Sequence, residues 1–187
     1  MVIISGYWSW QEIDFTYDHN GLRTSKTAGS TITKYICLGD KLVHVTVGST
    51  PLHIYYDAQG RPAILNYNGT VYIYITNMQG DVLGLRNTSG TKVVRYHYDP
   101  WGYVLSATGS LATTVGKNQP LRYRGYVYDE ETGLYYLQSR YYNPEWGRFI
   151  SADSVINGNL FAYCGNNPIN RIDESGHLGW ELLLTIK

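Results

Sequence analysis

The sequence of 187 residues lacks the features on which several functional classes depend. Its 15 lysine and arginine residues balance 15 aspartate and glutamate residues, so the formal net charge is zero. Proteins that bind nucleic acid by neutralising phosphates need an excess of basic side chains, and this chain has none. No apolar run approaches the roughly 18 residues that a membrane span requires. We therefore expect neither a nucleic-acid partner nor a membrane span.

Residues that bind metals or cofactors are also scarce. Cys37 and Cys164 lie too far apart to form a metal-binding pair by spacing, and two cysteines make no disulfide framework. The five histidines show no i,i+4 or His-x-His grouping, so we expect no metal site: His19, His44, His53, His97 and His177. The chain contains no phosphate-binding loop and no dinucleotide fingerprint, and we expect no cofactor.

Tyrosine and glycine are abundant, at 19 and 20 residues, and tyrosine recurs in one phrase. The phrase is Tyr-Asp, two or three residues, then Gly. Asp at the first position of a turn accepts local backbone N–H bonds, and Gly supplies the positive φ that closes the turn. Each copy therefore predicts a strand, a turn and a second strand. The clear copies begin at Tyr17, Tyr56 and Tyr98, and looser copies begin at Tyr128 and Tyr142.

The segments that flank these phrases are rich in β-branched and aromatic residues, as strands are. Alternation of Val43, Val45 and Val47 with His44 and Thr46 indicates one buried and one wetter face. We predict an all-β fold of eight to twelve short strands in consecutive antiparallel hairpins, with little helix. The stretch 106–119, rich in Ser, Thr and Gly, is predicted to be a long loop.

Two runs of the chain carry a family resemblance. Residues 121–153, which include Leu121-Arg-Tyr-Arg-Gly-Tyr-Val-Tyr-Asp129 and Ser139-Arg-Tyr-Tyr-Asn-Pro-Glu-Trp-Gly-Arg148, resemble the RHS repeat-associated core. Residues 159–173 resemble the end of the same core, and the upstream phrases resemble the YD repeats of bacterial polymorphic toxins. The resemblance covers about residues 15–177.

The resemblance implies a fragment of a hollow, teneurin-like β-shell, built as a curved RHS/YD-repeat sheet. Members of the family are secreted or cell-surface proteins, some of them wall-associated, and their shells enclose a toxin payload. We divide the chain into a lead-in (1–14), YD-repeat hairpins (15–105), the loop (106–119), the core (120–177) and a tail (178–187). The tail is too short for a toxin domain, so we expect a structural fragment without a payload. Its partners would be the shell or payload of a parent protein.

The N-terminus has no basic region and no apolar core of signal-peptide length, so the chain would be cytoplasmic if expressed alone. The open strands at the edges of an isolated sheet fragment would also favour edge-to-edge self-association.

Several branches of the family cut their own chain with a pair of aspartates. The matching positions here are Asp153 and Asp173, and the bond cut would follow His177. Two close carboxylates can share one proton, so that one activates water while the other protonates the leaving amide. The family surrounds these aspartates with Pro and Gly and places Leu at the cut. Here Gly176 is kept, while both prolines and the Leu are absent. The alternative interpretation is that Asp153 ends a strand and Asp173 begins a turn.

A carbohydrate- or cell-wall-binding module is the remaining alternative, since aromatic ladders on β repeats can stack on sugar rings. It requires a solvent-exposed row of Tyr56, Tyr72, Tyr74 and Tyr98, whereas a shell requires these rings to line the concave face. Four core arginines are predicted to pair with carboxylates or to stack on tyrosines. They are Arg122, Arg124, Arg140 and Arg148.

Overall fold

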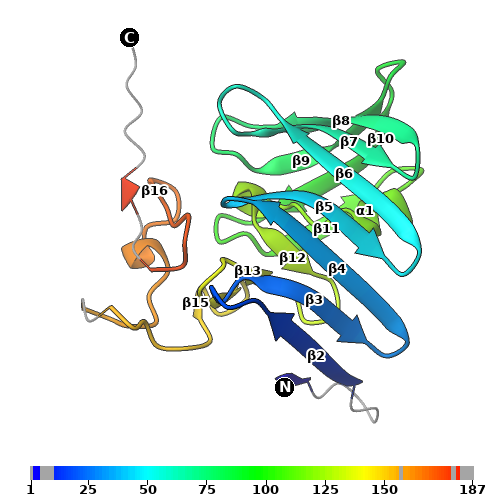
Figure 1. The fold of residues 1–187 in the computed structure, drawn as a ribbon. Helices are drawn as coiled ribbons and strands as arrows, with labels where there is room; N and C mark the ends of the chain where they lie inside the picture. The colour runs from blue at the N-terminus through cyan, green and yellow to red at the C-terminus, as the bar shows by residue number, and fades with distance from the viewer. Residues whose placement is uncertain (1, 5–10, 156–157, 178–179, 182–187) are drawn as a thin grey trace.

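A computed structural model describes residues 2–4, 11–155, 158–177 and 180–181 of the chain. Eleven strands form one antiparallel sheet in sequence order, four short strands form a second sheet, and two form a third (Figure 1). The first sheet contains β1 (Val2–Ile4), β2 (Gln11–Tyr17), β3 (Arg23–Ala28), β4 (Thr31–Leu38), β5 (Lys41–Val47), β6 (Thr50–Tyr56), β7 (Pro62–Tyr67), β8 (Thr70–Thr76), β9 (Val82–Asn87), β10 (Lys92–Tyr98) and β11 (Val104–Thr108). The second sheet contains β12 (Val127–Asp129), β13 (Leu134–Tyr136), β14 (Tyr141–Asn143) and β15 (Arg148–Phe149), and the third contains β16 (Arg171–Ile172) and β17 (Trp180–Glu181). The helical elements are the short α-helix α1 (Val115–Asn118) and the 3₁₀ helices η1 (Tyr123–Gly125) and η2 (Cys164–Asn166).

The Tyr-Asp phrases form the turns that the sequence predicts. In the turn that begins at Asp57, the carboxylate Oδ1 accepts the N–H groups of Gln59 and Arg61, each at 2.9 Å. The turns at Asp18 and Asp99 repeat this pattern, and each closes on a glycine with positive φ. The register shifts beside each of these turns, as at a β-bulge. Bulges increase the local twist of a strand pair, so the repeated phrase helps the sheet to curve.

The predicted all-β fold of consecutive antiparallel hairpins is confirmed, while one segment differs from the prediction. The stretch 106–119 is not a loop throughout, because β11 ends within it and α1 lies near its end. The lead-in 1–14, for which the sequence predicted no particular structure, contains β1 and part of β2, which pair with each other. Only strand pairing across the sheet could reveal these elements, because neither has a strong local pattern. No helix within the described residues has the length and apolar character to cross a membrane.

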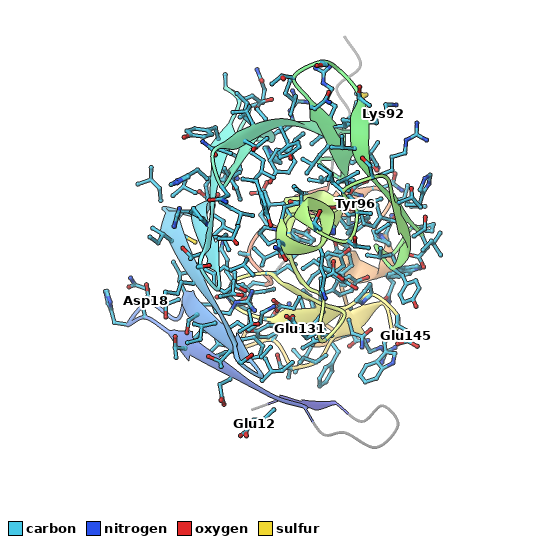
Figure 2. All side chains as sticks on the ribbon, turned by 90° about the vertical axis from the view of Figure 1, so that its right-hand side faces the viewer. Glu12, Asp18, Lys92, Tyr96, Glu131 and Glu145 are labelled. Atoms are coloured by element: carbon cyan, nitrogen blue, oxygen red, sulfur yellow. The ribbon has the colours of Figure 1, made fainter. Side chains whose placement is uncertain are left out.

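The curved sheet surrounds the segment that follows it. In Figure 2 the strands ring the short helix α1 and the labelled Tyr96. Gln119, directly after α1, is fully buried and bonds to the Tyr74 and Tyr96 hydroxyls at 3.2 and 3.1 Å. Arg122 lies 4.1 Å above the Tyr96 ring centroid. The interior of the sheet is therefore filled by the chain's own polar and aromatic side chains.

Buried charged side chains connect the eleven-stranded sheet to the four-stranded sheet. Asp129 at the end of β12 is completely buried and accepts hydrogen bonds from Arg23 Nη1 at 2.6 Å and Lys26 Nζ at 3.0 Å, both on β3. The guanidinium of Arg23 also lies 4.5 Å from the Tyr35 ring centroid and 4.6 Å from that of Tyr136. A buried ion pair contributes little net stability, but loss of one partner is costly. These contacts therefore fix where the second sheet sits.

The four tyrosines named in the carbohydrate hypothesis are buried or partly buried. Tyr72 and Tyr74 are buried at 8% and 6% exposure, and Tyr56 and Tyr98 are partly buried against the same apolar cluster. Tyr98 also packs against a second cluster of buried side chains, which consists of Tyr123, Tyr126, Tyr135, Leu137, Tyr142, Phe149, Tyr163 and Cys164. The exposed row required by the carbohydrate hypothesis is not formed by these four rings.

Gly102 and Gly21 occupy equivalent places in two of these turns, with φ of +88° and +80°. A Cβ on Gly102 would lie 2.5 Å from the Tyr123 ring, whereas a Cβ on Gly21 would meet nothing within 4 Å. We expect Gly102→Ala to lower the free energy of unfolding by about 1–3 kcal/mol more than Gly21→Ala, because overpacking adds to backbone strain. Urea denaturation of both variants measures this difference. Equal losses would show that Tyr123 moves aside without cost.

Candidate functional site

Three turns that are distant in sequence meet at one side chain, Arg140. The turn before β14 carries Arg140, the segment after β15 carries Asp153, and the turn after β16 carries Asp173. Arg140 Nη2 lies 2.8 Å from Asp153 Oδ2 and 4.0 Å from Asp173 Oδ2. The distance between Asp153 Oδ2 and Asp173 Oδ2 therefore cannot exceed the sum of these two distances. The structure brings the predicted aspartates to one site, with a cation between them.

Both oxygens of Asp153 have partners. Oδ2 contacts Arg140, and Oδ1 accepts hydrogen bonds from the Val155 N–H and from Nδ1 of His177, both at 2.9 Å. The Asp153 side chain is 7% exposed. Burial acts to raise the pKa of Asp153, but the hydrogen bonds from Val155 and His177 and the charge of Arg140 outweigh it and hold the pKa below its usual value. Asp153 is therefore a carboxylate at neutral pH.

Asp173 organises the turn that follows it. Its Oδ1 accepts N–H bonds from Ser175, Gly176 and His177 at 3.3, 2.8 and 3.2 Å. Gly176 has φ of +82°, and a Cβ there would lie 2.6 Å from Ser139 Oγ. Close packing on the turn before β14 thus accounts for the glycine that the family motif retains. Ser139 Oγ also donates to the Ser175 carbonyl at 2.6 Å, which joins the two turns.

Arg140 holds the backbone as well as the carboxylates. Its Nε donates to the Gly176 carbonyl, Nη1 to the Leu160 carbonyl at 2.8 Å, and Nη2 to the His177 carbonyl at 3.3 Å. The guanidinium carbon lies 3.6 Å from the Phe149 ring centroid. Burial lowers the pKa of Arg140, against the opposing effect of Asp153 and Asp173. Each of the three nitrogens of this side chain contacts a group of the core.

The chemistry open to this arrangement differs from that of an aspartate pair with a shared proton. A shared proton requires two carboxyl groups in near contact, one of them with a raised pKa. Here Arg140 lies between the two groups and the pKa of Asp153 is lowered. The His177 carbonyl, at the predicted cut, does receive a hydrogen bond from a cation, as a carbonyl under attack would need. Arg140 and its contacts with Asp153, Asp173 and His177, which we call the clamp, are typical of a structural site. The hydrogen bond to the His177 carbonyl is the one feature typical of a cleavage site.

Sequence reasoning missed the part played by His177. It treated this residue as the last one before the cut, whereas the imidazole is a partner of Asp153. The replacement of the family's Leu by an ionisable residue was the signal that could have indicated it.

Of the other arginines named from the sequence, two pair with carboxylates as predicted. Arg122 pairs with Glu130 at 2.8 Å, and Arg124 lies 3.7 Å from Asp81. Arg148 is exposed on the short strand β15, and among the described residues no carboxylate pairs with it and it stacks on no tyrosine, so the predicted pairing of Arg148 is wrong. Strands alternate their faces, and Phe149 takes the inward position there.

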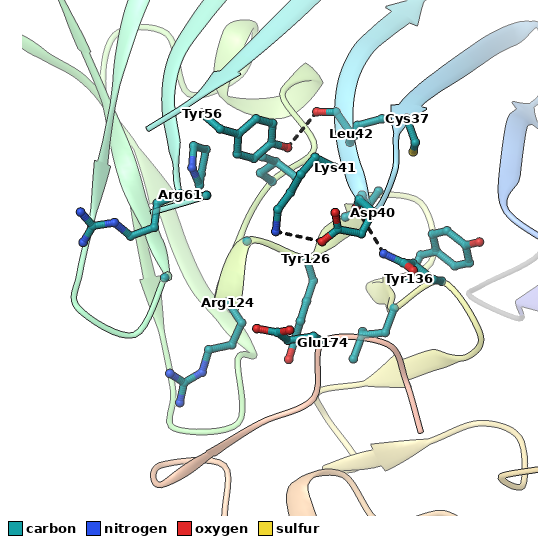
Figure 3. A pocket seen from close by; sticks show the side chains of 18 of the residues that line it. Cys37, Asp40, Lys41, Leu42, Tyr56, Arg61, Arg124, Tyr126, Tyr136 and Glu174 are labelled. Atoms are coloured by element: carbon teal, nitrogen blue, oxygen red, sulfur yellow. Dashed lines mark hydrogen bonds and ion pairs between the residues drawn. The ribbon is translucent and has the colours of Figure 1, made fainter. Parts of the chain in front are cut away.

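A cavity of about 280 Å³ lies beside the clamp, between the curved sheet and the core. Figure 3 shows Tyr56 and the Asp40–Lys41 ion pair on the sheet side, and Tyr126 and Glu174 on the core side. Glu174 lines the cavity and belongs to the turn that Asp173 organises, so one end of the cavity lies next to this turn. Its lining mixes apolar and charged side chains of both signs and indicates no single ligand class.

Comparison with known proteins gives consistent matches over nearly the whole chain. The sequence profile of the Teneurin YD-shell family matches residues 46–170. The tRNA3(Ser)-specific nuclease WapA of Bacillus spizizenii is 37% identical over 177 residues, which cover 89% of this chain and 8% of that protein. The tRNA nuclease WapA of Bacillus subtilis strain 168 is 36% identical over 178 residues, with the same coverage.

Solved toxin structures contain the same fold. A crystal structure of TcdB2-TccC3-TEV matches with a TM-score of 0.72 and 21% identity, over 94% of this chain and 9% of that chain. The Photorhabdus luminescens Tc holotoxin pore matches with a TM-score of 0.73 and 20% identity, over 96% of this chain and 9% of that one. The chain thus spans less than a tenth of the length of these proteins.

The lowered pKa of Asp153 predicts a pH-dependent contribution to stability. A carboxylate whose pKa falls on folding stabilises the protein above its unfolded pKa, about 3.9, and loses this contribution as the pH falls through the folded value. We expect Asp153→Asn to lower the free energy of unfolding by about 1–3 kcal/mol at pH 7, because Arg140 loses its charged partner. The difference from wild type should shrink below about pH 4.

Urea denaturation at pH 7, 5, 4 and 3 measures this difference, with Asp40→Asn as the control. Asp40 is exposed and its carboxylate pairs with the neighbouring Lys41 at the surface, so its removal should matter little at any pH. A loss for Asp153→Asn that stays constant from pH 7 to 3 would contradict the role of its charge.

Proposed function

The chain belongs to the Teneurin YD-shell family, and we propose that it forms a stretch of shell wall together with the segment that seals this wall from inside. The rest of such a shell, and a toxin payload enclosed by it, would complete the assembly. The matched relatives support this proposal, since two of them are named as tRNA nucleases and this chain corresponds to less than a tenth of each. The curved sheet is then one section of a longer wall.

One observation carries the proposal: the tyrosine-lined face of the sheet is covered by the chain's own core. Gln119 and Arg122 lie buried against Tyr96, and Asp129 is buried against Arg23 of β3. A sheet face occupied in this way offers no tyrosine ladder to a sugar. It supports a closed wall over the carbohydrate-binding alternative.

For the site around Arg140 we propose an anchor. Asp153, Asp173 and Arg140 together hold the side chain, the N–H and the carbonyl of His177. The chain beyond residue 177 would thereby leave the shell from a fixed point. Self-cleavage after His177 is the second candidate, favoured by the hydrogen bond from Arg140 to the His177 carbonyl.

A chimera tests the shell function. We expect this chain to replace the matched segment of the Bacillus subtilis tRNA nuclease WapA without loss of that protein's resistance to trypsin. Asp129→Ala in the chimera should abolish the resistance, because Arg23 and Lys26 lose a buried partner at a cost of about 3–5 kcal/mol. Asp40→Ala, which removes an exposed pair, should leave it unchanged. Digestion of the unsubstituted chimera at the rate of WapA lacking the segment would refute the proposal.

Intact mass separates the anchor from the protease. We expect the purified chain to keep its full mass over one day at pH 7, as should Asp173→Asn, because the lowered pKa of Asp153 opposes a proton shared with Asp173. Loss of residues 178–187 from wild type but not from Asp173→Asn would show instead that the aspartates cut the chain.

A further inference from the structure

Two histidines face each other on the outer surface of the sheet. His44 on β5 and His53 on β6 are directly opposite in the register of this strand pair. Their neighbours Val45, Leu52 and Ile54 are buried in the core, so the two imidazoles lie on the opposite, solvent-facing side. Their Nδ1 atoms are 3.1 Å apart, and the ring centroids are 4.5 Å apart.

A third side chain orients one of the rings. His44 Nε2 lies 3.0 Å from Thr46 Oγ1, two residues along the same strand and on the same face. When Nε2–H donates to this hydroxyl, Nδ1 of His44 carries the lone pair and points at His53. Metal-binding histidines usually make such an outer contact, because it fixes the tautomer that presents a lone pair to the metal.

The distance between the two nitrogens matches the bite of a chelate. With metal–nitrogen distances of about 2.0–2.1 Å, a cation bound to both Nδ1 atoms would have an Nδ1–metal–Nδ1 angle of roughly 100°. This value lies between the right angle of a square-planar site and the tetrahedral angle. From this geometry we infer that His44 and His53 form a two-histidine chelate for a divalent late transition metal, with Thr46 as the positioning residue.

The class of cation follows from the ligands. Imidazole nitrogens suit copper, nickel and zinc, and among these divalent ions the affinity of a given nitrogen site is highest for Cu²⁺. Within the described part of the chain, no group of three or more His, Cys, Asp or Glu residues could hold a metal ion. The chelate therefore supplies two ligands and leaves the remaining positions to water or to groups of a second molecule. Both ligands lie outside the candidate site and its clamp.

Calorimetric titration of the full chain with Cu²⁺, and separately with Zn²⁺, tests this inference at pH 7.5. We expect one metal ion per chain and tighter binding of Cu²⁺, with nitrogen hyperfine structure in the Cu²⁺ electron paramagnetic resonance spectrum. His44→Gln and His53→Gln should each weaken binding about tenfold or more. Thr46→Val should weaken it by about tenfold without removing a ligand, as loss of an outer-shell partner does.

His97→Gln is the matched control, because His97 is also exposed on the sheet and faces Ser106 on the neighbouring strand. It should bind the metal as wild type does. All four positions lie at the surface or only partly buried, so circular dichroism should show an unchanged fold in every variant. Equal affinities of wild type and the His44→Gln, His53→Gln double variant would overturn the chelate. A loss of binding in His97→Gln would overturn it as well.

Discussion

The burial of Asp129 between Arg23 and Lys26 is the constraint on which this structure depends. A meander of hairpins has a tyrosine-rich face that must be covered, and here the following segment of the same chain covers it. A fully buried carboxylate is tolerable only with its cations in place, so the pair accepts one docking position and penalises others. In this position Gln119 is buried against Tyr74 and Tyr96 inside the curved sheet.

The repeated Tyr-Asp turn shapes the sheet onto which the core docks. Each Asp accepts two backbone N–H groups, each Gly provides a positive φ, and the register shifts beside the turn. The shift twists the sheet, and before Asp57 and Asp99 the rings of Tyr56 and Tyr98 pack against the apolar cluster of the interior. One short phrase therefore sets both the bend of the wall and the aromatic surface on which the core packs. At Gly102 the same turn also touches the core directly, through the Tyr123 ring.

The residues around Arg140 are compatible with two functions, an anchor for His177 and self-cleavage after it. Spacing and family resemblance identify Asp153 and Asp173, and folding does bring them together. The environment of Asp153, however, lowers its pKa and stabilises its charged form rather than a shared proton. With His177 in place of the family's Leu, the imidazole occupies an oxygen of Asp153 that a catalytic pair would leave free. The same contacts that hold His177 in position thus act against proton sharing.

The all-β class and the turns could be predicted from the amino-acid sequence, because they depend on local chemistry: an Asp that caps a turn, a Gly that adopts positive φ, and alternation along a strand. The family followed from the resemblance of residues 121–173. The sequence also predicted carboxylate partners for Arg122, Arg124 and Arg140, but not which carboxylates they are, and its prediction for Arg148 failed because Phe149 rather than Arg148 faces inward on β15. The strand in 106–108, the pairing of His44 with His53 and the link from His177 to Asp153 came only from the tertiary structure. Each depends on which segments lie side by side, and that is decided by register across the sheet and by the buried charges that dock the core, neither of which is a property of a local stretch of chain.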